Sequence, residues 1–423
     1  MKLSGFAEYI WLDGTAPTQQ LRSKSRVVHL GDTPLATDFP VWSFDGSSTG
    51  QATGDDSDCI LQPVRAVKDP KRGPGNYLVL CEVFDPDGAP HATNHRARLR
   101  ADLEQAGDTD PWAGFEQEYT ICRNGRPLGF PEVGEPAPQG PYYCSVGSEV
   151  TFGRDLADAH ARACLDAGLM IYGINAEVMP GQWEFQIGYR GVEGEAADAL
   201  TMSDHVWLAR FLLQREGERF GYTVSFANKP VAGDWNGAGM HTNFSTTATR
   251  KTGSGLHAIN DAIRSLSRNH ALHIANYGDG LEARLTGLHE TCSIDEFRSV
   301  SPIGEPRSAF PSRWLHAASA ISKIAAPVPM PIPIVWPPAW CVPSVTQQPT
   351  AMRHPRQLSP PNRPDDYPWA GFVTDAAPGS ADAFPYEVVG AHIQYWDGKG
   401  VAADADFIDG VLHRGGMVLY RQT

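Results

Sequence analysis

The sequence predicts an α+β protein in which a strand-rich region precedes a region of mixed strands and helices. Between residues 7 and 92, runs of aromatic and β-branched residues such as YLVLCEVF end at turn residues such as FDPDG. Beyond residue 100, three segments space their apolar residues about 3.6 apart, which predicts helices. The 423 residues are enough for two or three domains.

The elements follow this division along the chain. AEYIWLDG and LRSKSRVV predict a β-hairpin near the start. The helical spacing covers residues 154–169, 203–221 and 255–270, and short glycine-flanked strands lie between these segments. Ser203 is a suitable N-cap for the second helix, and Gly221 is a suitable C-terminal stop.

Composition narrows the class of partner and the compartment. A formal net charge of -14 argues against nucleic acid or an anionic membrane as the main partner, which favours small molecules or protein subunits. Seven cysteines without a CxxC pair indicate reduced thiols in a cytoplasmic protein. The start lacks a signal-peptide pattern, and prolines argue against a spanning helix at 324–343.

The composition changes abruptly after Ser299. From 300 to 350 the charged residues are Glu305, Arg307, Arg313 and Lys323, and prolines multiply, as in KIAAPVPMPIPIVWPPAW. Proline has no amide donor and its ring clashes with a preceding helical turn, so neither a helix nor a central strand can use this pattern. The segment is therefore either a linker or abnormal sequence.

Paired carboxylates carry the first chemical signal. Glu116 and Glu118 in FEQEYT share one face if the segment is a strand, although a solvated strand face has the same pattern. In NAEVMPGQWEFQIG, a proline–glycine turn can bring Glu177 and Glu184 onto neighbouring antiparallel strands. Four acids would then converge, and their mutual repulsion requires a cation between them.

A histidine-bearing strand adds the second signal. In NGAGMHTNFS, His241, Asn243 and Ser245 would share a face, and a histidine beside four carboxylates is better explained as a ligand than as a core residue. Oxygen ligands with one imidazole suit Mg²⁺ or Mn²⁺, which complete their shells with phosphate and water. This donor set suggests phosphoryl transfer.

Two further segments fit such a reaction, although each is weak alone. FDGSSTGQATGDDSD places Asp45 in a loop of small residues, which is also typical of a surface turn. RLTGLHET contains Arg284, which can grip a carboxylate in a bidentate way, and Glu290, with Gly287 lending mobility.

From about residue 7 to 298 the chain resembles type II glutamine synthetases. The resemblance is carried, in family order, by YIWLDGT, FDGSSTGQ, PWAGFEQEYT, PQGPYYCSVG, NAEVMPGQWEFQIG, NGAGMHTNFST and RLTGLHET. It implies a small β-grasp-like N-terminal domain at 1–95 and a catalytic α/β domain of antiparallel strands and helices at 96–299. It also implies a homo-oligomer, usually a decamer, whose active sites are shared between neighbouring subunits.

The resemblance also implies roles for individual residues. Glu118, Glu177 and Glu184 would hold one divalent cation, and Glu116 and His241 would hold a second. Asn236, Gly237 and Arg284 would bind glutamate, and the surroundings of Trp112 with Asn243 and Ser245 would bind ATP. Asp45 of the adjacent subunit would take a proton from ammonium, and Glu290 would close over the intermediate. The implied reaction is ATP-dependent ligation of ammonia to L-glutamate through a γ-glutamyl phosphate.

Some positions depart from the family pattern. Phe152 stands where a tyrosine is usual near the ammonium site, which leaves ligation of an organic amine as an alternative. The segment YRGVEGEAADALT is longer than usual and predicts a surface insertion. The later motifs NRGASIRIP and EDRRP are missing, and with them phosphate-binding arginines and the third ligand of the second cation.

Loss of one nucleotide near the codon for Ser299 accounts for both missing motifs. Residues 299–311 (SVSPIGEPRSAFP) can then be re-read as G-V-A-D-R-G-A-S-I-R-I-P. Residues 319–334 permit a second reading that contains E-D-R-R-P, eight codons further on. The glutamate codon would be spelled by the last letter of Ser322, a G, and the first two letters of Lys323, which must be AAG.

The frame change predicts two further regions. Residues 300–342 would be an out-of-frame remnant of the catalytic domain, and 343–423 a read-through tail of unknown structure, with an unrecognised small domain as the alternative. We expect the chain as translated to be impaired in catalysis. A catalytically inactive subunit that keeps the oligomer surface is a further alternative.

Overall fold

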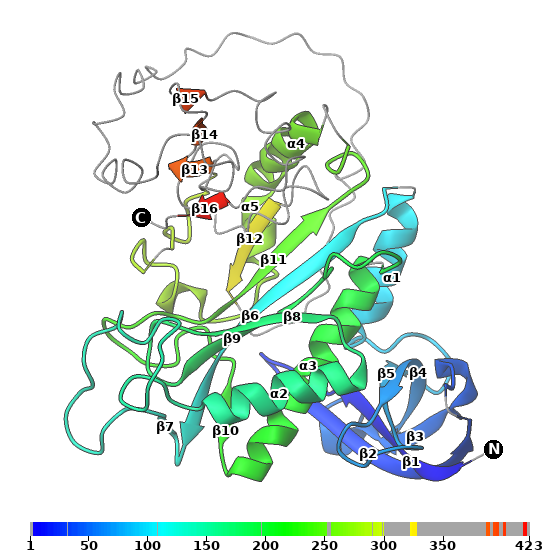
Figure 1. Cartoon of the computed structure of the whole chain (residues 1–423). Helices are drawn as coiled ribbons and strands as arrows, with labels where there is room; N and C mark the ends of the chain where they lie inside the picture. Colours follow the sequence, from blue (N-terminus) through cyan, green and yellow to red (C-terminus); the bar gives the residue numbers. More distant parts are fainter. Residues whose placement is uncertain are drawn as a thin grey trace. The chain divides into compact units, whose positions relative to one another are not determined.

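The computed structural model describes residues 3–299 apart from 32, 108, 196, 252–254, 290 and 298 (Figure 1). Beyond them it describes 322–327, 386–389, 392–396, 401–402 and 418–420. The chain divides into two compact units, Met1–Arg298 with Ser312–Cys341, and Ser299–Pro311 with Val342–Thr423. The first unit contains both regions for which the sequence predicts domains.

A five-stranded sheet forms the N-terminal part, in the order β2-β1-β5-β4-β3. Its strands are β1 Leu3–Leu12, β2 Leu21–Leu30, β3 Trp42–Asp45, β4 Asp58–Lys68 and β5 Tyr77–Phe84. The predicted hairpin is the antiparallel pair β1 and β2, whereas β1 and β5 pair in parallel at the centre. Short 3-10 turns lie at Ala36–Asp38 and Gly46–Thr49.

The two faces of this sheet bury different cores. Tyr9 and Val79 face a core within the N-terminal part, whereas Ile10, Leu78 and Leu80 join the core of the catalytic part. Because β5 is covered on both faces, it reads as a continuous apolar run rather than as an alternating one. The two parts of the first unit thus share a core.

The catalytic part is built on a seven-stranded sheet with the order β12-β11-β6-β9-β8, to which β7 and β10 add by pairing with β6. Every pairing in it is antiparallel. Its strands are β6 Trp112–Arg123, β7 Arg126–Pro127, β8 Ile171–Ala176, β9 Gln182–Ile187, β10 Thr223–Ser225, β11 Gly239–Ser245 and β12 Ser322–Pro327.

Helices cover one face of the sheet, with α2 and α3 crossing β6, β8 and β9 in Figure 1. The helices are α1 His95–Ala106, α2 Arg154–Ala167, α3 Ala199–Phe220, α4 Gly255–Arg268 and α5 His270–Ile274, with a 3-10 turn at Leu281–Ala283. Alternate residues of β6, including Phe115 and Tyr119, pack with Leu156 and Leu208 of these helices. The opposite face therefore carries Glu116 and Glu118.

The predicted helices form, with corrections at their ends. Helix α3 begins at Ala199, because the Asp198 carboxylate accepts a hydrogen bond from the amide of Thr201 at 2.8 Å. Ser203 is therefore not the N-cap, and its hydroxyl instead donates to the carbonyl of Ala199. Gly221 ends the helix with φ 66°, as predicted. The segment predicted as one helix at 255–270 divides into α4 and α5 at Asn269.

A buried histidine makes the stability of this core depend on pH. His160 on α2 is fully buried, its Nε2–H donates to the carbonyl of Ala209 at 3.0 Å, and burial lowers its pKa to about 4. The unfolded chain takes up a proton below about 6.5, where the folded chain does not. The stabilisation from His160 is therefore complete above pH 6.5 and is lost as the pH falls towards 4.

We expect the melting temperature of the full chain to fall between pH 6.5 and 4, and to fall less in His160→Gln. Each pH unit in this interval changes the unfolding free energy by about 1.4 kcal/mol for one such group. Thermal unfolding followed by circular dichroism measures the slope. The control substitution is His29→Gln, at an exposed position of β2. Equal slopes for the parent and His160→Gln would contradict the assignment.

The described strands of the second unit form a four-stranded sheet with the order β15-β14-β13-β16. They are β13 Tyr386–Val389, β14 His392–Trp396, β15 Val401–Ala402 and β16 Val418–Tyr420. Strands β13 and β16 pair in parallel, although nearly thirty residues separate them. Across the described parts of both units, no helix combines the length and apolarity that a membrane crossing needs.

Candidate metal centre

Five side chains gather on the face of the catalytic sheet that the helices leave uncovered. They form two groups that share one carboxylate, namely Glu116 with Glu184 and His241, and Glu118 with Glu177 and Glu184. Within each group the candidate ligand atoms lie within 4.8 Å of one another. The sequence analysis selected all five residues, and the structure brings them together.

Strand register explains most of this convergence. Glu118 on β6 lies opposite Glu184 on β9, and Glu116 on β6 lies opposite His241 on β11. Directly opposed residues of antiparallel strands place their side chains on the same face, about 5 Å apart. Because β6 is the central strand, its two glutamates meet ligands from both neighbours.

Glu177 reaches the group through a tight turn rather than through a strand. It follows the end of β8, its amide bonds to the carbonyl of Gln182 at 2.8 Å, and Gly181 in the turn has φ 71°. That φ is accessible to glycine at no steric cost, which is why the turn needs this residue. Asn175 then donates to the Glu177 carboxylate at 2.9 Å and fixes its direction.

The second group consists of three carboxylates. Burial raises the pKa of Glu177 well above its usual range, and the neighbouring Glu118 and Glu184 raise it further. Such a set is unfavourable when all three groups are ionised. Oxygen donors at this spacing fit a hard divalent cation, which would offset their repulsion.

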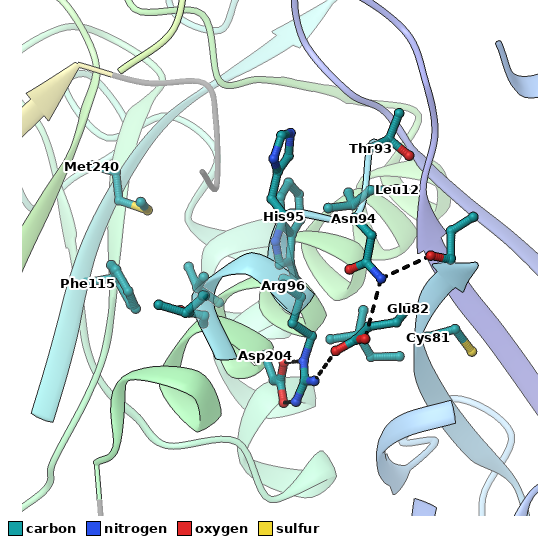
Figure 2. Close-up of a pocket in the computed structure, with 16 residues that line it drawn as sticks. Leu12, Cys81, Glu82, Thr93, Asn94, His95, Arg96, Phe115, Asp204 and Met240 are labelled. Atoms are coloured by element: carbon teal, nitrogen blue, oxygen red, sulfur yellow. Dashed lines mark hydrogen bonds and ion pairs between the residues drawn. The ribbon is translucent and has the colours of Figure 1, made fainter. Parts of the chain in front are cut away.

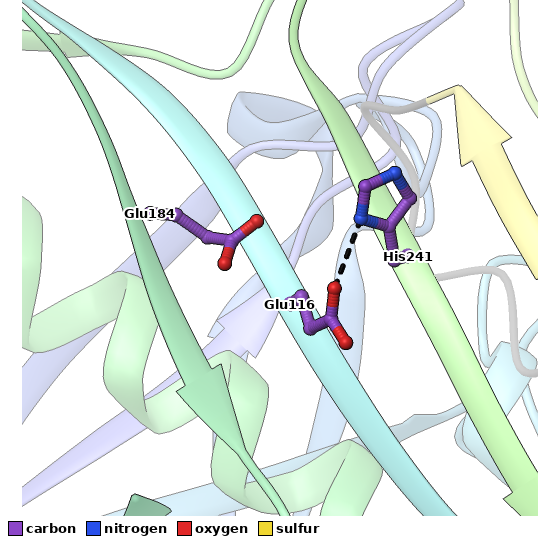
Figure 3. A group of neighbouring side chains, drawn as sticks. All are labelled: Glu116, Glu184 and His241. Carbon is purple, nitrogen blue, oxygen red and sulfur yellow. Dashed lines mark hydrogen bonds and ion pairs between the residues drawn. The ribbon is translucent and has the colours of Figure 1, made fainter. Parts of the chain in front are cut away.

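The Glu116 carboxylate is held from β11 at both oxygens. His241 Nδ1 lies 3.0 Å from Oε2, and Asn243 Nδ2 donates to Oε1 at 2.9 Å (Figure 3). In Figure 3, Glu184 points from β9 towards the same space. A donor set of one imidazole and two carboxylates suits Mn²⁺ well and Mg²⁺ less well than an all-oxygen set does.

Arg284 lies beside the three-carboxylate group. Its side chain is about nine-tenths buried, and its Nη2 is 3.7 Å from a Glu118 oxygen. Within the described part of the chain, its Nε and Nη1 are buried without a hydrogen-bond partner. Burial lowers its pKa, and the Glu118 charge counters that effect. Orphaned guanidinium donors beside this group are suited to a second carboxylate from a ligand.

Two glycines make room for this arginine. A Cβ on Gly237 would lie 2.6 Å from Arg284 Cγ, and one on Gly239 would lie 2.7 Å from its Nη2. The predicted glutamate-binding residues Gly237 and Arg284 therefore lie in contact. Asn236 is held by Gln139, whose side chain accepts from the Asn236 amide at 2.7 Å and donates to its Oδ1 at 2.9 Å.

The remaining β11 residues lie near an aromatic cluster. Ser245 pairs with Trp112, and its hydroxyl accepts from Arg250 at 2.9 Å. The Arg250 guanidinium lies 4.5 Å from the Trp112 ring, and Tyr189 packs on that ring with a centroid distance of 5.1 Å. Trp112 and Ser245 are thus brought together, as the sequence analysis expected for a nucleotide region.

Other predicted site residues lie elsewhere. Asp45 ends β3 in the N-terminal sheet, is exposed, and accepts hydrogen bonds from Ser47 and Ser48, which lower the pKa of its carboxyl. Glu290 lies outside the described residues. Phe152 packs against Gly129 and lies 6.3 Å from the Tyr142 ring.

The predicted insertion after Gly188 is exposed at 191–194, with Tyr189 and Ala197 anchoring its ends in the core.

Sequence reasoning missed three residues that fix the site. Gln186 donates to Glu184 and, at 2.6 Å, to Asn175, which in turn holds Glu177. Gln186 is two residues from Glu184, so the alternation of a strand could have indicated it. Gln139 comes from a loop, and no periodic signal pointed to it.

A separate pocket lies on the helix-covered side, between β5, α1 and α3 (Figure 2). Its polar groups bind one another. Arg96 donates to Glu82 at 2.6 Å and to Asp204 at 2.7 Å, and Asn94 donates to Glu82 at 3.4 Å. These ion pairs join the N-terminal sheet to the helices, and we interpret the pocket as structural.

Family models match three parts of the chain. Residues 4–86 match the model described as "Glutamine synthetase, beta-Grasp domain", and residues 93–275 match "Glutamine synthetase, catalytic domain". Residues 372–421 match a third model, described as "Agrobacterium tumefaciens protein Atu4866". The last match supports the alternative of an unrecognised small domain within the region for which we expected a read-through tail.

Curated relatives agree with the first two matches. The chain is 53% identical over 306 residues to "Glutamine synthetase, chloroplastic" of Chlamydomonas reinhardtii, with 69% of this chain and 78% of that protein covered. It is 53% identical over 293 residues to "Glutamine synthetase" of Neurospora crassa, with the same coverage. A solved structure described as "GmaS/ADP complex-Conformation 1" is 19% identical with a TM-score of 0.49, and 70% of this chain and 65% of that one are covered.

A β-grasp domain followed by a sheet that bears these carboxylates defines an ATP-dependent ligase. The chain belongs to the glutamine synthetase family. Enzymes of this family join ammonia to glutamate at the expense of ATP and use divalent metal ions.

Proposed function

We propose that the five-residue cluster holds two divalent cations, Mg²⁺ or Mn²⁺, for ATP-dependent ligation of ammonia to L-glutamate. The observation that carries the proposal is the pair of groups that share Glu184, with all candidate ligand atoms of each group within 4.8 Å. Glu118, Glu177 and Glu184 are assigned to one cation, and Glu116 and His241 to the other. When bound, the cations supply charge neutralisation to the phosphates of ATP.

Glutamate recognition is assigned to Asn236, Gly237 and Arg284. The two orphaned donors of Arg284 support this assignment, since a ligand carboxylate would satisfy both. The two hydrogen bonds between Gln139 and Asn236 support it further, because they fix the loop that contains Asn236 and so hold its backbone in one orientation. The γ-carboxylate of glutamate would then lie towards the acidic cluster, where phosphoryl transfer takes place.

ATP is assigned to Trp112, Asn243 and Ser245. Asn243 links the nucleotide region to the cluster through its hydrogen bond to Glu116. Ser245 lies two residues further along β11, on the same face of the sheet. The Trp112 ring, with the Arg250 guanidinium over it and the Tyr189 ring tilted against it, supplies the aromatic surface that a base needs. The γ-carboxylate of glutamate attacks the γ-phosphate and releases ADP to give an acyl phosphate, and ammonia then displaces inorganic phosphate to give the amide.

Asp45 and Glu290 are assigned to steps that follow formation of the acyl phosphate. Asp45 is assigned to proton removal from ammonium in the site of an adjacent subunit, and its exposure at the edge of the N-terminal sheet supports such a role. Glu290 is assigned to the flap that excludes water from the acyl phosphate. A cytoplasmic homo-oligomer, a decamer by family resemblance, is part of this proposal.

Ammonia is the proposed acceptor, and an organic amine is the alternative that Phe152 suggested. Its contact with Gly129 is a packing contact and gives no support to the amine. Parallel assays of a frame-restored chain with ammonium and with methylamine distinguish the two. A higher kcat/KM with the amine would replace the proposal.

The domain organisation is proposed as 1–95 and 96–299 for the two glutamine synthetase domains, with 300–342 as an out-of-frame remnant. The register of β12 supports the frame change. Position 323 lies opposite Asn243 and position 325 lies opposite His241, so 323 stands on the face of the acidic cluster. The re-reading assigns the missing glutamate to the codon that straddles 322 and 323, beside the second cation.

The tail is better described as a separate coding region than as random read-through. Residues 372–421 match a family of their own, and an arbitrary reading frame would not be expected to do so. We propose that the frame change joins a glutamine synthetase sequence to a second protein-coding sequence. Nucleotide sequencing across codons 295–345 tests this, and a codon other than AAG for Lys323 would exclude it.

Lys323→Glu should strengthen Mn²⁺ binding by the full chain. At the position paired with Asn243, the change replaces a positive charge with a carboxylate. At an effective dielectric of about 20, one unit charge at 4 Å contributes about 4 kcal/mol. We expect the dissociation constant, measured by electron paramagnetic resonance of free Mn²⁺, to fall about 10-fold or more. Lys68→Glu makes the same charge change at an exposed position of β4 and is the control. Equal effects of both variants would reject the register argument.

A further inference from the structure

A buried arginine lies behind the acidic cluster, on the helix-covered face of the sheet. Arg210 on α3 is 2% exposed, and its guanidinium has no carboxylate partner among the described residues. It lies between the rings of Trp207, at 4.8 Å, and Phe226, at 5.0 Å. Burial lowers its pKa to about 9, which leaves it charged at neutral pH. A buried charge without a counter-ion is costly, so its retention calls for a reason.

Two hydrogen bonds of the Arg210 guanidinium go to one side-chain amide, that of Gln117. Arg210 Nε donates to Gln117 Oε1 at 2.8 Å, and its Nη2 donates to the same oxygen. Gln117 is fully buried and lies on β6 between Glu116 and Glu118. A guanidinium can only donate, so it fixes which end of the amide faces it. The Gln117 NH₂ group must therefore point away from Arg210.

That NH₂ group bridges the two strands that carry the proposed ligands. Gln117 Nε2 donates to the backbone carbonyl of Glu118 at 2.7 Å and to that of Gly239 on β11 at 3.3 Å. The amide of Gly239 in turn donates to the Glu118 carboxylate. Gly239 is thus held at its N–H by a proposed cation ligand and at its C=O by Gln117.

We infer that Arg210 and Gln117 are positioning residues for the cation site, which brace β6 against β11 from behind the sheet. The brace holds Glu118 in place through Gly239, and it holds the β6–β11 junction two residues from His241. Arg210 acts by orienting the Gln117 amide, not by its charge at the cluster. The inference rests on the proposed cation site, because positioning has no meaning without a cation to position.

Gln117→Glu separates positioning from electrostatics and from packing. The new carboxylate would pair with Arg210, so the fold should keep or gain stability. It adds a negative charge near the cluster, which by electrostatics alone would tighten cation binding. It cannot donate to the Glu118 and Gly239 carbonyls, so loss of positioning weakens binding. Electrostatics and loss of positioning therefore predict opposite changes in the affinity for the cation.

The experiment is a titration of the full chain with Mn²⁺, followed by electron paramagnetic resonance, with thermal unfolding measured in parallel. We expect Gln117→Glu to retain its melting temperature and to bind Mn²⁺ about 10-fold or more weakly, the usual cost of losing a group that orients a ligand. Unchanged or tighter binding overturns the inference. Absence of Mn²⁺ binding by the parent chain overturns the cation site itself, and this inference with it.

A second variant covers the case in which Gln117→Glu does not fold. Arg210→Met places an apolar side chain between Trp207, Phe226 and Met240, an exchange that buried charges often tolerate. It frees the Gln117 amide to rotate, and we expect a loss of Mn²⁺ affinity of about 10-fold. Arg219→Met, at an exposed position of the same helix, is the matched control. Equal affinities of the two arginine variants for Mn²⁺ would overturn the inference.

Discussion

The 423-residue chain should form no measurable glutamine from glutamate, ammonium and ATP, and restoring the frame after Ser299 should raise turnover by about 10³-fold or more. The re-read segment contains four arginines, two in each motif, and the translated segment has isoleucine, glycine, serine and alanine in their place. A charge-assisted hydrogen bond stabilises by about 1.5 to 3 kcal/mol. Loss of one donor to a developing charge reduces the rate by about 10² to 10³.

Three chains are compared, since restoring the frame changes residues 343–423 as well as the segment 300–342. The first is the chain as given, the second is the frame-restored chain, and the third has the restored segment joined to residues 343–423. Phosphate release and glutamine formation are measured for each, with circular dichroism to compare folding. Activity in the third chain assigns the defect to the out-of-frame segment. Turnover by the chain as given within about tenfold of the second would disprove the frame-change explanation.

Glu184→Gln should remove measurable binding of Mn²⁺ by the full chain, a loss of about 10²-fold or more. Glu184 belongs to both ligand groups, so one exchange of an oxygen for NH₂ weakens both. The variant also removes a negative charge beside Glu177, whose pKa the other carboxylates raise. We therefore expect the cation-free variant to be as stable as the parent or more stable, so that lost binding cannot be attributed to unfolding.

Glu104→Gln is the matched control, because it makes the same exchange of glutamate for glutamine at an exposed position of α1. Electron paramagnetic resonance measures free Mn²⁺, and thermal unfolding is recorded with and without the cation. In the parent, Mn²⁺ should raise the melting temperature, and in Glu184→Gln it should not. Retained Mn²⁺ affinity in Glu184→Gln would place the cations elsewhere.

Local sequence was a reliable guide wherever one periodic signal dominated. The β1–β2 hairpin and β5 lie where strand-forming runs predict them, and α2 lies where helical spacing predicts a helix. The start of α3 was wrong, because two residues with capping side chains, Asp198 and Ser203, lie within one and a half turns of each other. Helix propensity alone cannot choose between these two residues. Burial of Ala199 and Met202 favours the helix start at Asp198.

The candidate site was accessible from the sequence because its ligands follow the rules of strands and turns. Alternation in FEQEYT and a proline–glycine turn between Glu177 and Glu184 suffice to predict convergence. Gln139 and Arg210 were not accessible, since each acts across the fold on a residue about a hundred positions away in sequence. Such pairings depend on how the elements pack, and no local pattern records them.

By itself the sequence determined which residues carry the chemistry, in which family they occur, and that the chain departs from that family after Ser299. The tertiary structure alone decided that one carboxylate, Glu184, belongs to both ligand groups, and that an uncompensated arginine braces the sheet behind them. The physical reason is that side-chain periodicity is a property of a single strand. Register between strands and burial behind them are set only when the whole sheet packs.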